Sequence, residues 1–108
     1  MRLGLIGICL IVGLSGCNRP EVEKPLPLTA EIGEGLYALK HCSTCHAIDG
    51  KGGNIGCDLS RVAKRREKEW MARWLKDPQA VRPGTRMPDM GLSDEEALAI
   101  AEYLDTRR

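Results

Sequence analysis

The chain has 108 residues, the size of one small domain. Its 16 Lys and Arg residues nearly balance 15 Asp and Glu residues, so it lacks the basic excess typical of nucleic-acid-binding proteins. Aromatic residues make up only 4% of the chain and Phe is absent, so side chains alone supply little material for a core. The five Cys residues indicate disulfides, a metal or a covalently bound group.

The first segment has the pattern of an export signal. Arg2 precedes an apolar stretch, residues 3–14, which is too short to span a bilayer as a helix. The stretch runs into Leu14-Ser15-Gly16-Cys17, which resembles the lipobox of bacterial lipoproteins, where the Cys receives the lipid. We therefore expect residues 1–16 to be a lipoprotein signal peptide and Cys17 to be lipidated. The alternative is an ordinary secreted protein that is cut nearby and keeps Cys17 as a spare thiol.

A Pro-rich segment separates this signal from the rest of the chain. Residues 18–28 mix Pro with charged residues and predict an extended tether, so residues 17–28 form a lipidated Cys and tether. More than one acyl chain on Cys17 would give stable anchoring to a membrane. The remaining residues, 29–108, are expected to form the single domain.

The spacing of apolar residues in this domain predicts three helices. We expect them over about residues 30–41, with Thr29 as the cap, over about 63–76, and from a Ser93–Glu96 capping box to about 105. Asp77-Pro78 should end the second helix. No segment alternates between apolar and polar residues for long enough to predict a β-strand. Apolar residues recur at helical spacing on the first helix (Ile32, Leu36 and Leu39) and form a stripe on the second (Trp70, Met71, Trp74 and Leu75). The inner face of the last helix should carry Ala97, Ile100, Ala101 and Leu104.

Charge is unevenly distributed along the domain. Basic residues dominate residues 61–76, whereas residues 89–105 carry only acidic ones. This pattern fits either two solvated helix faces or a dipolar surface that orients a docking partner.

The strongest motif is Cys42-Ser43-Thr44-Cys45-His46, the Cys-x-x-Cys-His signal for attachment of a c-type haem. Residues three apart on a helical turn face the same way, so both thiols can reach the two vinyl groups along one porphyrin edge. His46 would then bind iron through Nε2 while Nδ1 donates to a backbone carbonyl. We therefore expect one haem, covalently held by Cys42 and Cys45 and ligated by His46.

Two other uses of these residues compete with haem attachment. A thioredoxin-like redox pair usually ends a strand in an alternating strand–helix pattern, which is absent here. A zinc site could use Cys42, Cys45, His46 and Cys57, but no second closely spaced pair of ligands follows.

With these motifs, the chain resembles a small bacterial class I cytochrome c over about residues 29–104. Besides residues 42–46, the resemblance rests on Gly56-Cys57-Asp58-Leu59, similar to the family's Gly-Pro-x-Leu, and on Pro83-Gly84-Thr85-Arg86-Met87-Pro88, similar to its methionine-ligand loop. The closing helix, which ends in Glu102-Tyr103-Leu104, also matches. The resemblance implies an all-α cytochrome c fold, with three or more helices around one covalently attached haem.

The second axial ligand of the iron must come from the opposite face of the haem. His41 is adjacent to Cys42 and cannot readily cross to that face, and Met71 lies on an apolar helix stripe typical of core packing. Met87 and Met90 both lie in the Pro-rich loop, and the resemblance selects Met87. A thioether ligand raises the reduction potential, and a filled sixth position leaves no room for O₂ or peroxide.

The haem itself is expected to fill the centre of the core. Leu59 and Trp74 are the expected haem-pocket residues, and Trp70 or Trp74 could donate its indole N–H to a haem propionate or simply pack. On the first helix, Gly33 and Tyr37 should meet the last helix, where small residues let the backbones approach. The residues of the last helix that should take part in this contact are Ile100, Ala101 and Tyr103.

Cys57 departs from the family pattern, because it stands where the family usually has Pro. The backbone carbonyl at this position normally accepts the Nδ1–H of the haem-ligating His, and Cys keeps the carbonyl but lacks the fixed φ of Pro. We expect a buried, inert thiol, with an intermolecular disulfide or a replacement iron ligand as the alternatives.

The predicted function is one-electron transfer by a low-spin His/Met haem in a lipid-anchored protein on the periplasmic side of a bacterial membrane. The expected partners are redox proteins of the cell envelope, with no nucleic acid and no small-molecule substrate. One alternative is a haem subunit of a multi-chain oxidoreductase, for example one reducing a nitrogen oxide. The other is a haem sensor or peroxidase with an open iron site.

Overall fold

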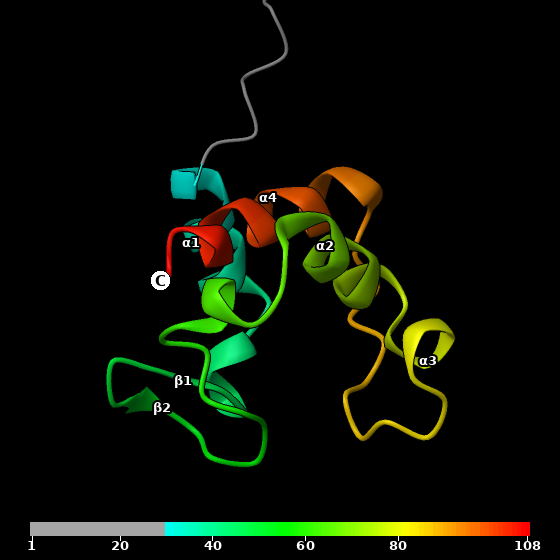
Figure 1. Ribbon diagram of the computed structural model, residues 1–108, viewed down its shortest axis with the longest axis horizontal. Coiled ribbons are helices and arrows are strands. Elements are labelled where there is room, and N and C mark those ends of the chain that lie inside the picture. The colour runs from blue at the N-terminus through cyan, green and yellow to red at the C-terminus, as the bar shows by residue number, and fades with distance from the viewer. Residues whose placement is uncertain (1–29) are drawn as a thin grey trace, which may run out of the picture.

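The computed structural model describes residues 30–108; the predicted signal peptide, Cys17, the tether and Thr29 lie outside the described residues. Three helices form the body: α1 (Ala30–Leu39), α2 (Lys68–Lys76) and α4 (Asp94–Asp105). Helix α4 packs against both α1 and α2 and so joins the two sides of the molecule (Figure 1). The prediction of an all-α fold is confirmed.

Helices α1 and α4 cross at very short range. A Cβ atom on Gly33 would lie 1.9 Å from the carbonyl oxygen of Ala99 and 2.8 Å from the Cβ of Tyr103, so no larger residue fits there. Beside this crossing the rings of Tyr37 and Tyr103 meet with their centroids 5.6 Å apart. The expectation that small residues let the first and last helices approach is therefore confirmed.

Helix α4 begins where its sequence predicted. The Ser93 hydroxyl accepts a hydrogen bond from the Glu96 N–H at 3.1 Å, and the Glu96 carboxylate accepts one from the Ser93 N–H at 3.0 Å. This capping box satisfies two backbone donors that the helix itself cannot use. The predicted inner face is buried throughout: Ala97, Ile100, Ala101 and Leu104.

The second helix is shorter than predicted, because α2 starts at Lys68 rather than near residue 63. Before it lies a short 3₁₀ turn, η2 (Val62–Lys64), and then Glu67 in an extended conformation. Like charges four residues apart within the predicted range, Lys64 and Lys68, disfavour a continuous helix here. Within α2, Met71 and Leu75 are buried, which confirms the core role expected for Met71.

Several short elements are present that the sequence did not predict. Asp77 ends α2, but its side chain also accepts from the Ala80 N–H and so begins a further turn, α3 (Pro78–Val81). Proline is well suited to such a first helical position. A 3₁₀ turn, η1 (Cys42–Thr44), and a two-residue antiparallel hairpin, β1 (Ala47–Ile48) and β2 (Lys51–Gly52), precede it in the chain.

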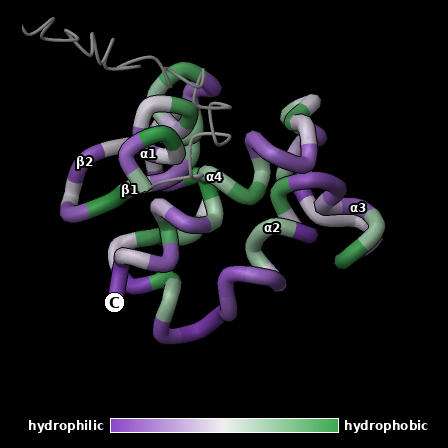
Figure 2. Tube along the Cα trace, turned by 90° about the horizontal axis from the view of Figure 1, so that it is seen from above, coloured by the Kyte–Doolittle hydropathy of each residue, from purple (hydrophilic) through white to green (hydrophobic). Residues whose placement is uncertain are grey.

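One hydrophobic cluster connects these elements. Along α1, α2 and α4 apolar and polar residues alternate in short stretches, the pattern of helices with one buried face (Figure 2). The cluster consists of Tyr37, Leu59, Val62, Met71, Leu75, Leu92, Ala97, Ile100, Ala101 and Leu104.

Among residues 30–108, no helix is long and apolar enough to cross a membrane.

Ion pairs tie the acidic last helix to basic residues of other elements. Glu96 lies 3.4 Å from Lys40, and Glu102 lies 3.6 Å from Lys68. These partly exposed pairs stabilise the fold little. They do neutralise much of the negative charge on α4, so the dipole suggested by the sequence is weakened on its acidic side.

Candidate haem site

The Cys-x-x-Cys-His motif forms one compact helical turn. The N–H groups of Cys45 and His46 both donate to the Cys42 carbonyl, at 3.2 and 3.1 Å, which gives the turn that the spacing predicted. Both thiols are free and only partly buried, and burial raises the pKa of the Cys42 thiol. His41, just before the turn, is exposed and has a φ of 59°.

The imidazole of His46 is held by the chain itself. Its Nδ1 lies 2.7 Å from the backbone carbonyl oxygen of Cys57. Because a carbonyl only accepts hydrogen bonds, Nδ1 carries the proton, and the neutral ring keeps its lone pair on Nε2. The carbonyl of Cys57 thus fixes the tautomer needed for binding a metal, even without the Pro that is usual there.

The glycine-rich loop wraps closely around this turn. A Cβ on Gly56 would lie 2.4 Å from Cε1 of His46, and one on Gly53 would lie 2.1 Å from the Thr44 carbonyl oxygen. The Gly56 N–H donates to the Cys45 carbonyl at 2.7 Å. The sequence predicted only an irregular loop for this segment. The several Gly residues directly after the motif are the signal that could have indicated its close packing against the motif.

The methionine loop lies on the other side of the molecule from the β-hairpin (Figure 1). Met87 and Met90 are both partly buried and pack against the hydrophobic cluster. The indole N–H of Trp74, one of the two donors suggested for a propionate, instead lies 2.8 Å from Sδ of Met87. Trp74 therefore orients the thioether that the family resemblance selects.

Gln79, which was not among the predicted site residues, shapes this loop. Its amide nitrogen donates to the Thr85 carbonyl at 2.7 Å, and its amide oxygen accepts from the Gly84 N–H at 2.9 Å. Gly84 has a φ of 85°, which Gly adopts without strain. No sequence pattern distinguishes Gln79 from an ordinary surface residue.

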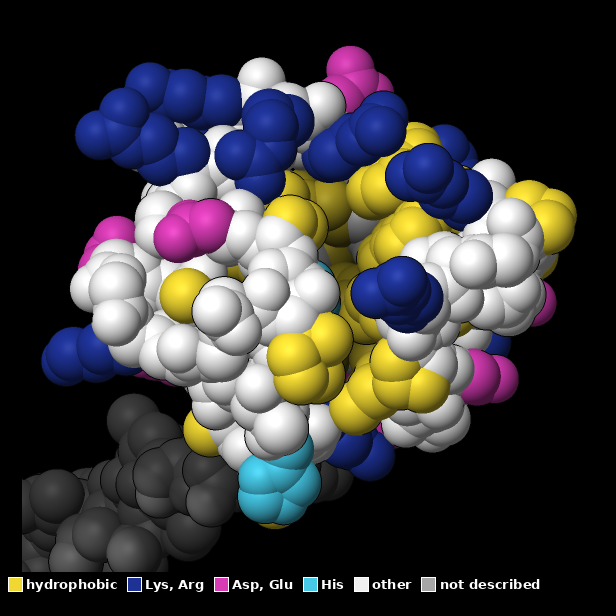
Figure 3. All heavy atoms as spheres, turned by 90° about the horizontal axis from the view of Figure 1, so that it is seen from below, with side chains coloured by type: hydrophobic (Ala, Val, Ile, Leu, Met, Phe, Trp, Pro, Cys, Tyr) yellow, Lys and Arg dark blue, Asp and Glu magenta, His cyan; other side chains and the backbone are white. Residues whose placement is uncertain are grey.

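Apolar side chains gather in a hollow seen from below the molecule, with Lys and Arg along part of its rim (Figure 3). Of the two expected pocket residues, Leu59 is buried and Trp74 is partly buried. Trp74 also stacks on Trp70, with ring centroids 5.2 Å apart. The hollow is apolar, and both expected pocket residues offer apolar surface.

These residues fit a haem. A donor nitrogen with its tautomer fixed, a Gly56 that leaves room for the His46 ring, and two free thiols on one turn are the features the group requires. Among residues 30–108, no group of three or more His, Cys, Asp or Glu side chains could hold a metal ion. The four residues of the zinc alternative therefore do not assemble a cluster.

Cys57 corrects one expectation. We predicted a buried thiol, but the Cys57 side chain is exposed. Its backbone carbonyl faces His46, whereas its side chain lies at the surface.

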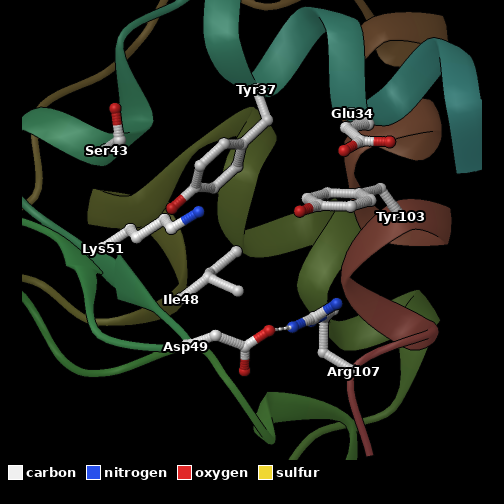
Figure 4. A pocket seen from close by; sticks show the side chains of 8 residues that line it. All are labelled: Glu34, Tyr37, Ser43, Ile48, Asp49, Lys51, Tyr103 and Arg107. Carbon is white, nitrogen blue, oxygen red and sulfur yellow. Dashed lines mark hydrogen bonds and ion pairs between the residues drawn. The ribbon is translucent and has the colours of Figure 1, made fainter.

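A separate pocket of about 320 Å³ opens between α1, the hairpin and the end of α4 (Figure 4). There, Arg107 forms an ion pair with Asp49, which ties the segment after α4 to the segment after the haem motif. Burial raises the pKa of Tyr37, which lines the pocket, to about 12. None of the residues expected to hold haem lines this pocket.

The domain that carries this site also matches a known family. The profile of the family described as "Cytochrome c" matches residues 30–108. The chain belongs to the cytochrome c family. The family confirms the predicted covalent haem c and assigns the protein to haem-mediated electron transfer.

Three curated relatives illustrate the range of this cytochrome family. Cytochrome c-552 of Bradyrhizobium diazoefficiens is 30% identical over 114 residues, covering 100% of this chain and 99% of its own length. A nitric oxide reductase subunit of Cereibacter sphaeroides is 27% identical, covering 93% of this chain and 76% of its own length. Cytochrome c oxidase subunit 2 of Bacillus subtilis is 32% identical over 69% of this chain.

The chain spans only 25% of that oxidase subunit, and a similar share of its relative from Alkalihalophilus pseudofirmus. No solved structure matches this cytochrome significantly.

Proposed function

We propose that this cytochrome is a lipid-anchored electron carrier on the periplasmic side of a bacterial membrane, with His46 and Met87 as the two axial ligands of its haem. The observation that carries the proposal is the hydrogen bond from His46 Nδ1 to the Cys57 carbonyl, at 2.7 Å. It leaves Nε2 free as a ligand and holds the ring in place. Haem supplies an iron that gains or loses one electron at a time.

The residues of the motif have distinct tasks. The thiols of Cys42 and Cys45 hold the porphyrin edge as thioethers, and the turn that joins them to His46 sets the distance between edge and ligand. Leu59 and Trp74 exclude water from the ring. Apolar surroundings that exclude water help to set the reduction potential of the iron, together with its ligands.

Met87 is proposed as the second ligand on two grounds. Its loop is held by Gln79, and its sulfur is oriented by the Trp74 indole at 2.8 Å. Met90 lies in the same loop and is also partly buried, but no hydrogen bond orients its sulfur among residues 30–108. With both axial positions filled, small molecules such as O₂ do not reach the iron, and outer-sphere electron transfer is the chemistry left.

The test compares two methionine variants. Purified holoprotein should show a porphyrin adduct by mass spectrometry and, when oxidised, the weak sulfur-to-iron charge-transfer band at the red end of the visible spectrum. Met87→Ala should abolish this band, whereas Met90→Ala should retain it. The reverse result would assign Met90, and a high-spin spectrum with rapid CO binding by the unaltered protein would indicate a sensor or peroxidase.

The anchor is a separate part of the proposal, supported by Leu14-Ser15-Gly16-Cys17. Mass spectrometry should find diacylglyceryl-modified Cys17 as the first residue of the mature protein. Cys17→Ser should release holoprotein from the membrane without changing its spectrum. Membrane retention of that variant would contradict the lipid anchor and leave the haem proposal untouched.

A second candidate role is a haem subunit of an oxidoreductase that acts on a nitrogen oxide. The likeness to the nitric oxide reductase subunit of Cereibacter sphaeroides favours it, since this relative is matched over 93% of the chain. A protein with this role should co-purify with its partner chain at fixed stoichiometry in mild detergent. A free carrier should elute alone and bind partners weakly, in a salt-sensitive way.

A further inference from the structure

A compact cluster of positive charge lies on the turn between the haem motif and α2. Three backbone hydrogen bonds close this turn, to the carbonyls of Arg61 and Val62 at 2.9–3.1 Å. Buried Val62 fixes the turn to the hydrophobic core, and the charged side chains that flank it are exposed. We call residues 61–66 the basic turn; its four exposed cations are Arg61, Lys64, Arg65 and Arg66.

None of the four cations of the basic turn takes part in an ion pair within residues 30–108, and the same holds for Lys51, Arg73, Arg82 and Arg86. Among residues 30–108, the five ion pairs use Lys40, Lys68, Lys76, Arg107 and Arg108. Arg65 instead donates to the backbone carbonyl of Asp58, at 2.8 Å. The chain between the buried Val62 and Trp70 of α2 is hydrophilic over residues 64–69 (Figure 2). The turn therefore presents an excess of positive charge that internal pairing leaves in place.

A column of aromatic contacts connects the basic turn to the candidate ligand. The guanidinium of Arg66 lies over the Trp70 ring, 4.2 Å from its centroid. Trp70 stacks on Trp74 with an interplanar angle of 16°, and the Trp74 indole donates to Met87 Sδ. Four side chains in direct contact thus lead from an exposed cation to the thioether proposed to bind iron.

We propose that the basic turn is the docking surface for a redox partner whose contact face carries carboxylate groups. The inference rests on the proposed function, because it names the partner of the electron carrier. Stacked on Trp70, the planar guanidinium of Arg66 keeps its N–H donors at its edges, where a carboxylate can bind two of them. Complementary charge also steers the encounter without requiring a large interface, as suits a short-lived redox complex.

An anionic bilayer would also attract these cations. The aromatic column decides between the two partners, because it ends on the candidate ligand rather than on the surface alone. Docking at the basic turn therefore places a partner at one end of a continuous contact with the redox site, which is useful for electron exchange and irrelevant to membrane binding.

The first experiment measures electron exchange of the full-length holoprotein in neutral detergent with hexacyanoferrate(III). Reduced iron loses one electron, and the reagent gains it to become hexacyanoferrate(II). The double variant Arg61→Gln/Lys64→Gln should slow this reaction at least about threefold at low ionic strength. A matched variant, Lys51→Gln/Arg108→Gln, removes the same charge from the hairpin and from the segment after α4, and it should stay near the unaltered rate.

The second experiment needs no electron transfer. Hexacyanochromate(III) is a redox-inert paramagnetic anion that broadens NMR signals of nearby protons. It should broaden the backbone amides of residues 61–66 and the indole signal of Trp70 in the unaltered protein, and broaden them less in Arg61→Gln/Lys64→Gln. The amide of Lys51 is the internal reference and should change little.

The outcomes separate the two proposals. Equal slowing by both double variants, or broadening spread evenly over the surface, would overturn the docking surface while leaving the electron carrier intact. Absence of haem, or no electron exchange with any reagent, would instead refute the proposed function. If bilayers with phosphatidylglycerol protect the basic turn and abolish its effect on the exchange rate, the surface belongs to the membrane and the redox-partner inference is wrong.

Discussion

The Nδ1 atom of His46 lies 2.7 Å from the carbonyl oxygen of Cys57. The two residues belong to different loops, so the orientation of the candidate ligand depends on a backbone group eleven positions further along. A backbone carbonyl is present whatever side chain follows it. This explains how Cys can occupy a position that usually holds Pro, and it makes the neighbouring Gly56 the more sensitive residue.

Gly56→Ala should disrupt haem ligation. Its new Cβ would lie 2.4 Å from the His46 ring, so the imidazole must move away from the Cys57 carbonyl. We expect loss of the low-spin spectrum and poor haem incorporation, measured by the Soret band per protein. Cys57→Ala is the matched control, because it keeps the carbonyl, and its Soret band should not shift. A shift in that control would show that the Cys57 thiol itself ligates iron.

Gly33→Ala and Gly35→Ala should change stability in opposite directions. At Gly33 the added methyl would meet the Ala99 carbonyl at 1.9 Å, so the two helices must separate, at a cost of about 1–3 kcal/mol. At Gly35 nothing lies within 4 Å of the new Cβ, and Ala should stabilise the helix by up to about 1 kcal/mol. Guanidinium unfolding of the holoprotein measures both. Equal effects at the two positions would contradict the close crossing of α1 and α4.

Trp74→Phe should lower the reduction potential of the haem. The indole N–H withdraws electron density from the Met87 sulfur, which favours the reduced iron, and Phe cannot donate. A neutral hydrogen bond of about 1 kcal/mol corresponds to a shift of at most about 40 mV for one electron. Trp70→Phe removes an indole that does not contact the sulfur, and its potential should stay close to that of the unaltered protein. Spectroelectrochemistry distinguishes the two variants.

Tyr37→Phe should improve stability in alkali and leave it unchanged at neutral pH. Among residues 30–108, the buried Tyr37 hydroxyl has no hydrogen-bond partner, so removing it costs little. Burial raises the pKa of Tyr37 from 10.0 to about 12. The unfolded chain therefore loses this proton first, and stability falls as the pH rises from 10.0 toward about 12.

The measurement for Tyr37 is the denaturant midpoint at several pH values across this range. The midpoint of the unaltered protein should fall more steeply than that of the variant. Some loss will remain in the variant, because burial also raises the pKa of Tyr103. Identical slopes would show that Tyr37 ionises as freely in the folded protein as in the unfolded chain.

Local signals in the sequence predicted much of the fold. The capping box fixed the start of α4, and apolar spacing found the buried faces of α2 and α4. The start of α2 was misplaced because the charged residues before it have good intrinsic helix propensity, whereas the chain instead forms the η2 turn and an extended Glu67 there. The short α3 was missed because Asp77-Pro78 is equally a stop signal and a start signal.

The sequence predicted the part of the candidate site in which haem chemistry sets the residue types and their spacing. It did not predict the contacts that hold this part in place. The Cys-x-x-Cys-His turn needs those residue types at those intervals, so sequence alone locates it. Gln79 supports the methionine loop, and Gly53 packs against the motif. Neither residue carries chemistry itself, so its residue type does not reveal its role. The exposure of Cys57 was also mispredicted, since a free thiol is usually buried and no local pattern marks this one as exposed.

The contact between Gly33 and Ala99 joins the first and last helices of the described chain, and the Cys-x-x-Cys-His turn lies between them. A close crossing of this kind forms only after nearly the whole domain has been made, because its two halves are the most widely separated in sequence. The Cys-x-x-Cys-His turn therefore lies within the long loop that this crossing closes, so a change at Gly33 that separates the two helices would also loosen the segment that carries Cys42, Cys45 and His46.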